Sequence, residues 1–342
     1  MKAVFAGAFV FLLFVCALSR SAKAQTNCYH VIPVSCAYYS LWGGPCLPAL
    51  PANAFNCNPG GPWEMDCEAI VNSCTSPPKA YQPACQKNGA SCSHPINLTS
   101  GNTYIQETDV RLAGLGGGLM LERTWNSIIP AVESAFQSGM FGLNWRSTYE
   151  ERVFQGSGEA SGFMVYLRSD GGLWYFNSNG TLAAPTNENA TLTQNGTQSW
   201  TITFQAGEKR VFSYTSGSLI QIVDRNANTT NLTYDSSNRL TTVTDPVSRH
   251  LYFSYANTLV TSVTSDFGVS LSYAYDNQGR LTQVTEPDQS TFNFDYNSQS
   301  LIADVKDSQG VILESHTYDS MGRGLTSSRA NGVDAVTVSY PQ

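Results

Sequence analysis

The cysteines are the residues of this sequence whose chemistry and spacing are most informative. Eight of them fall between Cys28 and Cys92, and none follows. An even number in an exported segment is typical of a disulfide framework. Zinc is the alternative use of such a cluster, but no Cys-x-x-Cys pair occurs and only His30 and His94 are near. We therefore expect no metal, and disulfides of open pairing among Cys28, Cys36, Cys46, Cys57, Cys67, Cys74, Cys85 and Cys92.

Groups that could perform catalysis are few in the rest of the chain. The sequence has no Gly-x-Ser-x-Gly elbow, no His-Glu-x-x-His motif and no P-loop. The glycine-rich run at 114–118 lacks the lysine and helix that a phosphate-binding loop needs, so an ordinary loop is expected. His250 and His316 lie in strand-like stretches, where solvated positions are expected. We expect no catalytic residue and no cofactor.

The N-terminus has the features of a secretory signal. Lys2 precedes an apolar run at 3–18, and small residues in Ala22-Lys23-Ala24 predict cleavage before Gln25. Retention as a membrane anchor stays open, although the run is shorter than the roughly 20 residues that span a bilayer. Lipid attachment at Cys16 is disfavoured because bulky residues precede it. The sequence therefore predicts a protein that is secreted or exposed at the cell envelope.

The composition limits both the fold and the partners. Of the 342 residues, 42% are hydrophobic and 13% charged, so the chain can bury a large core. The 28 Gly, 17 Tyr and 16 Phe favour short strands and tight turns over long helices. A net charge of -7 argues against binding to a phosphate backbone, which needs a basic surface. We expect an all-β protein that does not bind nucleic acid.

A tyrosine recurs at intervals of about twenty residues in the last part of the chain. An alternating strand precedes each tyrosine, as at 270–275, and a turn and a second strand follow it, as at 280–285. Each unit is therefore expected to be a strand, a turn, a second strand and a second turn. The series consists of Tyr214, Tyr234, Tyr255, Tyr275, Tyr296, Tyr318 and Tyr340.

The turn after the tyrosine has residues suited to a hairpin. The aspartate that follows can cap the turn through its side chain, and glycine or asparagine three positions later tolerates a positive φ. The expected turn residues are Asp235, Asn238, Asp276, Gly279, Asp319 and Gly322. For the tyrosines themselves, stacking on one sheet face is the structural interpretation. An exposed platform for sugar rings is the alternative.

At these residues the sequence resembles the YD-repeat, or RHS-repeat, family. The family unit is Tyr-Asp, two variable residues, Gly-Arg-Leu and a Val-Thr-Asp-Pro-like end, and the stretches 234–246 and 275–287 fit it closely. A second resemblance lies upstream. Thr99-Ser100-Gly101-Asn102, Asp109, Arg123-Thr124-Trp125-Asn126-Ser127 and Phe141-Gly142-Leu143-Asn144-Trp145 are similar to the domain that precedes the repeats in RHS proteins.

The resemblance implies antiparallel β-hairpin repeats that coil into a shell, which in the family can enclose a toxic C-terminal segment. About six repeat intervals are fewer than a closed shell needs, so a partial coiled sheet is expected. A cysteine-rich segment with little regular structure should precede it. The expected parts are a signal peptide at 1–24, the cysteine-rich disulfide segment at 25–95, a β-domain at 96–200 and YD repeats at 201–342.

The expected function is that of a non-enzymatic exported scaffold for interaction at the cell surface. Its partner would be a cell-surface glycan or protein, or a downstream RHS segment or effector. Two alternatives remain open: the chain is the front part of a toxin-delivery RHS polypeptide, or it is a carbohydrate-binding surface module.

Overall fold

The computed structural model describes residues 33–35, 55–60, 64–69, 92–93, 95–329 and 332–340 of the chain, so the predicted signal peptide lies outside them. Two units are present, Met1–Ser76 and Pro77–Gln342. In the first, β1 (Pro33–Ser35), β3 (Glu64–Ala69) and β2 (Phe55–Gly60) pair in that order as an antiparallel sheet. These strands are short, and no alternating apolar pattern marks them in the sequence.

The second unit begins with a set of small antiparallel sheets. Strands β4 (Cys92–Ser93) and β5 (Ile96–Asn97) form one pair, and β8 (Ser138–Gly139) and β9 (Gly142–Leu143) form another. A three-stranded sheet has the order β10 (Trp145–Ser147), β7 (Leu119–Asn126) and β6 (Tyr104–Leu112). Strands β11 (Arg152–Gln155), β12 (Met164–Leu167), β13 (Leu173–Phe176) and β14 (Leu182–Ala184) follow as a meander. Three short 3-10 helices, η1 (Leu115–Gly117), η2 (Ala131–Phe136) and η3 (Gly158–Ala160), connect them.

The repeats form one 15-stranded antiparallel sheet in which every strand pairs with its neighbours in sequence. Strands β15 and β29 are its two edges and do not pair with each other in the described part of the chain, so the sheet is open. This confirms the expected all-β fold with a partial coiled sheet. The strands are β15 (Ala190–Asn195), β16 (Ser199–Phe204), β17 (Lys209–Ser213), β18 (Leu219–Val223), β19 (Thr229–Tyr234), β20 (Leu240–Thr244), β21 (His250–Ala256), β22 (Leu259–Ser265), β23 (Ser270–Tyr275), β24 (Leu281–Thr285), β25 (Thr291–Tyr296), β26 (Ile302–Lys306), β27 (Ile312–Tyr318), β28 (Gly324–Arg329) and β29 (Val333–Thr337).

Alternation of apolar and polar residues gives this sheet two different faces. In β23, for example, Leu271 and Tyr273 are buried, whereas Ser270 and Ser272 are exposed. Because side chains along a strand point to opposite faces in turn, the apolar set of all strands collects on one side. We call this the inner face, and the opposite polar side the outer face.

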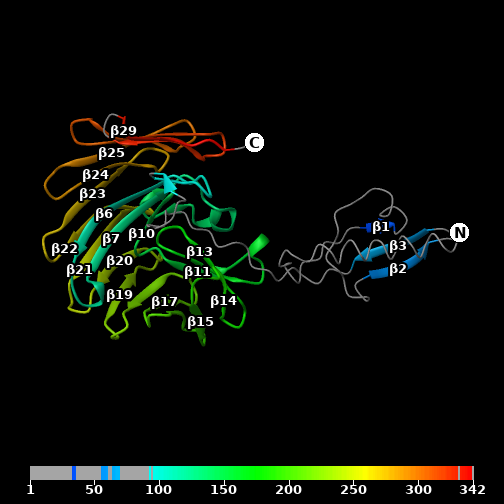
Figure 1. The fold of residues 1–342 in the computed structure, drawn as a ribbon. Helices are drawn as coiled ribbons and strands as arrows, with labels where there is room; N and C mark the ends of the chain where they lie inside the picture. Colours follow the sequence, from blue (N-terminus) through cyan, green and yellow to red (C-terminus); the bar gives the residue numbers. More distant parts are fainter. Residues whose placement is uncertain are drawn as a thin grey trace. The chain divides into compact units, whose positions relative to one another are not determined.

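The upstream β-domain packs on the inner face. Aromatic rings from the two parts meet directly: Phe141 lies 4.8 Å from Tyr273, and Trp145 lies 5.3 Å from Phe294, measured between ring centroids. Figure 1 shows β6, β7 and β10 alongside the curved repeat sheet. One continuous apolar cluster joins the two parts, so the upstream domain and the sheet share a core.

Candidate functional site

Six tyrosines of the repeat series each make the same kind of hydrogen bond to the backbone. Each hydroxyl donates to the carbonyl oxygen of a residue 15 or 16 positions earlier, at the start of the second strand of the preceding unit. The donors and acceptors are Tyr234 to Leu219 (2.5 Å), Tyr255 to Leu240 (2.8 Å), Tyr275 to Val260 (2.7 Å), Tyr296 to Leu281 (2.8 Å), Tyr318 to Ile302 (2.7 Å) and Tyr340 to Gly324 (2.8 Å).

A β-bulge lies opposite five of these rings, in the strand that follows the tyrosine. The strand register shifts immediately before Tyr234, Tyr255, Tyr275, Tyr296 and Tyr318. The extra residue belongs to the following strand, for example Thr282 opposite the step from Ala274 to Tyr275. The tyrosine keeps the alternation of its own strand, so its ring lies on the inner face. The rings are half-buried and pack on the apolar cluster of the inner face. The tyrosine series therefore joins each unit to the one before it, and its rings are not an exposed platform for sugars.

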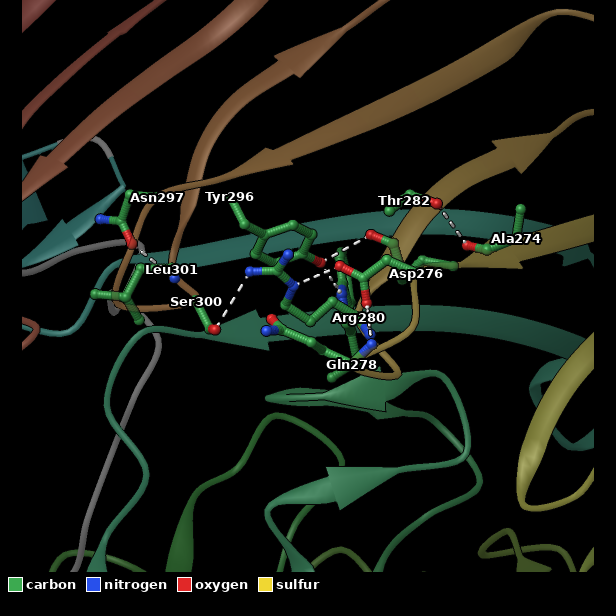
Figure 2. A network of polar contacts seen from close by, with 11 residues as sticks. Ala274, Asp276, Gln278, Arg280, Thr282, Tyr296, Asn297, Ser300 and Leu301 are labelled. Atoms are coloured by element: carbon green, nitrogen blue, oxygen red, sulfur yellow. Dashed lines mark hydrogen bonds and ion pairs between the residues drawn. The ribbon is translucent and has the colours of Figure 1, made fainter.

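The first turn of a unit is held by its aspartate, as Figure 2 shows for Asp276. One carboxylate oxygen accepts from the backbone N–H of Gln278 (2.9 Å) and of Arg280 (3.0 Å), and the other accepts from Arg280 Nε at 2.6 Å. Gly279 takes a φ of 73° within this turn. Burial opposes ionisation of Asp276, but the hydrogen bonds from Arg280 outweigh burial and lower its pKa.

The same turn is built at two other expected sites and at further sites that the sequence did not reveal. Asp235 with Asn238 (φ 58°) and Asp319 with Gly322 (φ 79°) repeat the geometry. Asp245 forms an equivalent turn at the opposite ends of the strands, again with an arginine four residues later. The missed signal was the Asp-x-x-x-Arg spacing, which occurs at both ends of the hairpins.

The arginine of this turn contacts the next unit. Its guanidinium carbon lies over the ring of the following tyrosine of the series, at 5.1, 4.8 and 4.2 Å from the ring centroid. A guanidinium over an aromatic face is attracted by the negative charge of the ring face. In units that contain this arginine, the tyrosine therefore bonds to the preceding unit and the arginine contacts the following one. The three pairs are Arg239 with Tyr255, Arg280 with Tyr296 and Arg323 with Tyr340.

Tyr214 does not occupy the position that its spacing predicts. The residue that pairs at the bulge of its hairpin is Phe212, opposite Leu219, just as Tyr275 pairs with Leu281. Tyr214 instead lies beyond the strand, 38% exposed, with its ring stacked on Trp200. Spacing could not separate the two residues, because Tyr214 lies 20 and Phe212 lies 22 residues before Tyr234, and both values occur in the series.

The upstream residues that carry the second resemblance converge on a buried ion pair. Arg123 Nε donates to Asp109 Oδ2 at 2.6 Å, and the Tyr273 hydroxyl donates to the same oxygen at 2.7 Å. The Arg123 guanidinium also lies 4.8 Å from the centroid of the Trp145 ring. The side chains of Arg123 and Asp109 are each 1% exposed. This network attaches the upstream domain to β23 through side chains that are fully buried.

A second group of ionisable side chains, one buried and two partly buried, lies nearby. Burial raises the pKa of Glu107 to about 7, although the positive charge of Arg123 opposes the shift. Glu314, whose charge also acts on Glu107, lies 3.5 Å from Nε2 of His316. His316 is 3% exposed, so the expectation of a solvated position was wrong for this residue. It alternates with Glu314 and Tyr318 on the inner face of β27, and its ring is buried there.

The glycine-rich run and three of the eight cysteines lie within the described residues. The glycine-rich run forms a loop that contains η1, and Arg249 of the repeat sheet donates to the carbonyl of Ala113 beside it (3.1 Å). Backbone register places Cys57 opposite Cys67, and Cys92 lies in β4. Cys28, Cys36, Cys46, Cys74 and Cys85 lie outside the described residues.

The described residues contain neither a cluster suited to a metal ion nor a helix suited to span a membrane. Within 95–329 and the other described ranges, no three His, Cys, Asp or Glu side chains are grouped so that they could hold a metal ion. No helix in the same part of the chain has the length and apolar character to cross a membrane.

Comparison with known proteins gives two family matches, one for each part of the second unit. Residues 93–181 match a domain of unknown function, DUF6531, and residues 175–340 match the Teneurin YD-shell. Among curated proteins, the tRNA nuclease WapA of Bacillus subtilis is 31% identical over 148 residues, and the tRNA3(Ser)-specific nuclease WapA of Bacillus spizizenii is 30% identical over 148 residues. Each match covers 43% of this chain and 6% of the relative, so the chain spans a small fraction of these proteins.

Similar solved structures come from Tc toxins. The TcdB2-TccC3-Cdc42 structure matches 66% of this chain and 12% of its own, with 15% identity and a TM-score of 0.28. The Photorhabdus luminescens Tc holotoxin pore matches 64% of this chain and 14% of its own, with 11% identity and a TM-score of 0.25.

Proposed function

Because this chain belongs to the YD-repeat (RHS-repeat) family, we propose that it is an exported, non-enzymatic β-scaffold that mediates interaction at the cell surface. The observation that carries the proposal is the use of the motif's polar groups. The hydroxyl of Tyr275, the carboxylate of Asp276 and the guanidinium of Arg280 are all engaged in turns or in contacts between units. Side chains that make these contacts keep the repeat sheet rigid, and a binding scaffold needs a rigid surface.

Export is supported by the sequence of the N-terminal part. The apolar run at 3–18 followed by Ala22-Lys23-Ala24 is typical of a signal peptide. The cysteines are confined to the segment that would follow cleavage, and disulfides persist in oxidising compartments outside the cytosol. Both features agree with a scaffold that works outside the cell.

The proposal can be tested by locating the protein and then adding it to cells. An epitope tag is placed after Gln342, the source cells are fractionated, and intact cells are treated with antibody and with protease. We expect the tagged protein in the medium or on the surface, and we expect the purified protein to bind intact cells of at least one kind. Retention in the cytosol, or no binding to any cell tested, would contradict the proposal.

A second candidate is that the chain is the front part of a toxin-delivery polypeptide. The observation in its favour is the similarity to WapA proteins, which are described as tRNA nucleases and of which this chain matches only 6%. Antibody raised against the repeat sheet should then detect a polypeptide much larger than this chain in the source cells. A neighbouring reading frame that continues the Tyr-Asp repeats would also support this second candidate.

A further inference from the structure

Carboxylates collect around Glu107 where β6 packs against the repeat sheet. The charges of Glu314, Asp109 and Glu286 all act on this residue and oppose its ionisation. The positive charge of Arg123 also reaches Glu107, but both carboxylate oxygens of Asp109 already bind that guanidinium, at 2.6 and 2.7 Å. Within the described part of the chain, no hydrogen bond or ion pair engages the side chain of Glu107 or of Glu286. Both residues are partly exposed, so a cation from solvent can reach two carboxylates that have no cationic partner among the described residues.

His316 lies beside the same carboxylates with its ring nitrogens unbonded. The residue is 3% exposed, and in the part of the chain that the structure describes neither Nδ1 nor Nε2 makes a hydrogen bond. Its Nε2 lies 3.5 Å from Oε2 of Glu314, so the ring points toward the carboxylates. Buried polar groups in folded proteins are nearly always hydrogen-bonded, and a neutral imidazole offers one nitrogen as an acceptor. An N–H donor from a ligand would therefore meet acceptors on both side chains.

Strand β6 offers a free edge next to this group. In the sheet order β10-β7-β6 it is an edge strand, and among the described residues β7 is the only strand paired with 105–112. The register shift between Thr108 and Val110 makes Asp109 an extra residue, so 105–108 is the regular stretch that contains Glu107. Unpaired N–H and C=O groups on such an edge bond readily to another extended chain.

We propose that the edge of β6 binds an extended polypeptide segment that carries lysine or arginine, with one cationic side chain held by Glu107, Glu286 and Glu314. Directly opposite residues of paired strands place their side chains on the same face, so a cation opposite Glu107 lies on the side of the carboxylates. Hydrogen bonds from an ammonium or guanidinium group to a carboxylate are about twice as strong as neutral ones. This inference rests on the proposed role in surface interaction and names the chemistry of one partner.

Other occupants fit this place less well. In the described ranges no three His, Cys, Asp or Glu side chains are grouped so as to hold a metal ion, so a bare metal cation lacks its ligands. A second copy of the chain would bring the same carboxylates on its own β6, and like charges opposite one another on paired strands are destabilising. A nucleic acid would bring phosphates to a group of side chains that is already anionic. A basic extended segment satisfies both the carboxylates and the strand edge.

The test uses the full chain and a fluorescently labelled peptide of alternating threonine and lysine, with the Kd measured by anisotropy at about pH 8 and low salt. Burial raises the pKa of Glu107 to about 7, so its carboxylate is charged under these conditions. We expect the peptide to bind, and we expect Glu107→Gln to raise the Kd about tenfold or more through the loss of a charge-assisted contact. Glu188→Gln is the matched control, because it removes the same charge from an exposed position between β14 and β15, and it should leave the Kd unchanged.

Two further peptides separate strand pairing from simple charge attraction. A lysine peptide that is N-methylated at every residue keeps its charges but cannot donate backbone hydrogen bonds, and it should bind about tenfold more weakly. A peptide with glutamate in place of lysine should not bind. When the unmodified lysine peptide is bound, amide hydrogen exchange at 105–108 should slow.

The inference is overturned if the lysine peptide does not bind, or if Glu107→Gln binds it as tightly as Glu188→Gln does. It is also overturned if the N-methylated or the glutamate peptide binds as tightly as the lysine peptide. Cell binding that persists in any of these cases would remove this site and leave the scaffold role standing.

Discussion

At the scale of single residues, the repeat depends on side chains that bond to the backbone. Asp276 organises its turn through two backbone N–H groups, and Tyr275 bonds to a carbonyl of the preceding unit. The capping aspartate and the residue with positive φ can be predicted from sequence, because few residue types satisfy those demands. The contact of Arg280 with the next tyrosine ring could not be predicted from sequence, because it depends on the distance between two units in space.

Replacing Gly279 tests the turn. Its φ of 73° lies in the left-handed region, which a β-branched side chain resists. We expect Gly279→Val to lower the free energy of unfolding by about 1–3 kcal/mol, measured by denaturant titration. Gly279→Asn is the matched control, because Asn238 holds a φ of 58° at the equivalent position, and it should cost well under half as much. Equal losses for the two variants would contradict the turn assignment.

Glu107 should make stability depend on pH. Its pKa is raised to about 7 by burial, so the folded protein binds a proton that the unfolded chain, near 4.5, releases. The stabilisation from this proton is complete below about pH 4.5 and is lost as the pH rises through about 7. Glu107→Gln, which cannot ionise, should therefore raise the free energy of unfolding at pH 8 by about 1–3 kcal/mol and change it little at pH 4.5.

The groups that act on Glu107 are Arg123, Glu314, Asp109 and Glu286, and none of them is altered by this substitution. The amide of glutamine has nearly the size of the carboxyl group, so packing is preserved. A difference between variant and wild type that stays the same from pH 4.5 to pH 8 would show that Glu107 does not carry the pH dependence.

At the scale of the structural element, the hydroxyl of each repeat tyrosine fixes one hairpin to the previous one. Tyr275→Phe removes the 2.7 Å hydrogen bond to the Val260 carbonyl, in a place where burial also raises the pKa of the tyrosine. We expect a loss of about 1–1.5 kcal/mol in the free energy of unfolding. Tyr252→Phe is the control, since this ring is exposed on the outer face, and it should change stability by less than about 0.5 kcal/mol.

The cysteine-rich segment makes a separate prediction at this scale. We expect the exported protein to show no free thiol when it is denatured without reductant and titrated with a thiol reagent. In β2 and β3 the register sets Cys57 opposite Cys67, and Cα atoms of directly opposed residues in antiparallel strands lie within the range that a disulfide spans. Several titratable thiols per chain would reject the disulfide framework.

Element boundaries show where reading the sequence succeeds and where it fails. The alternation of apolar and polar residues is regular in β19, β21 and β23, so strand type and facing follow from the pattern there. The hairpin of β17 and β18 has Phe212 at the bulge position, and spacing alone selected Tyr214 instead. Register depends on pairing across strands, and periodicity along the chain does not fix it at a degenerate unit.

At the scale of the whole molecule, the repeat sheet was predictable, but the contacts that hold the upstream domain on it were not. A period near twenty residues with matching turns indicates one continuous sheet. The contacts between Asp109 and Tyr273 or between Trp145 and Phe294 join residues more than 140 positions apart. No local pattern encodes such distances, and the burial of His316 on the inner face was also missed.

The direction of the tyrosine bonds has a consequence for the order in which the chain acquires its structure. Every acceptor carbonyl precedes its tyrosine by 15 or 16 residues, and the inner face is covered by a domain that precedes the entire sheet. In a polypeptide that emerges N-terminus first, each new hairpin can thus pack on a domain and on hairpins that are already folded. The sheet can therefore gain one hairpin at a time in the order of the chain. A pause in synthesis or transport would leave a shorter sheet that is already ordered.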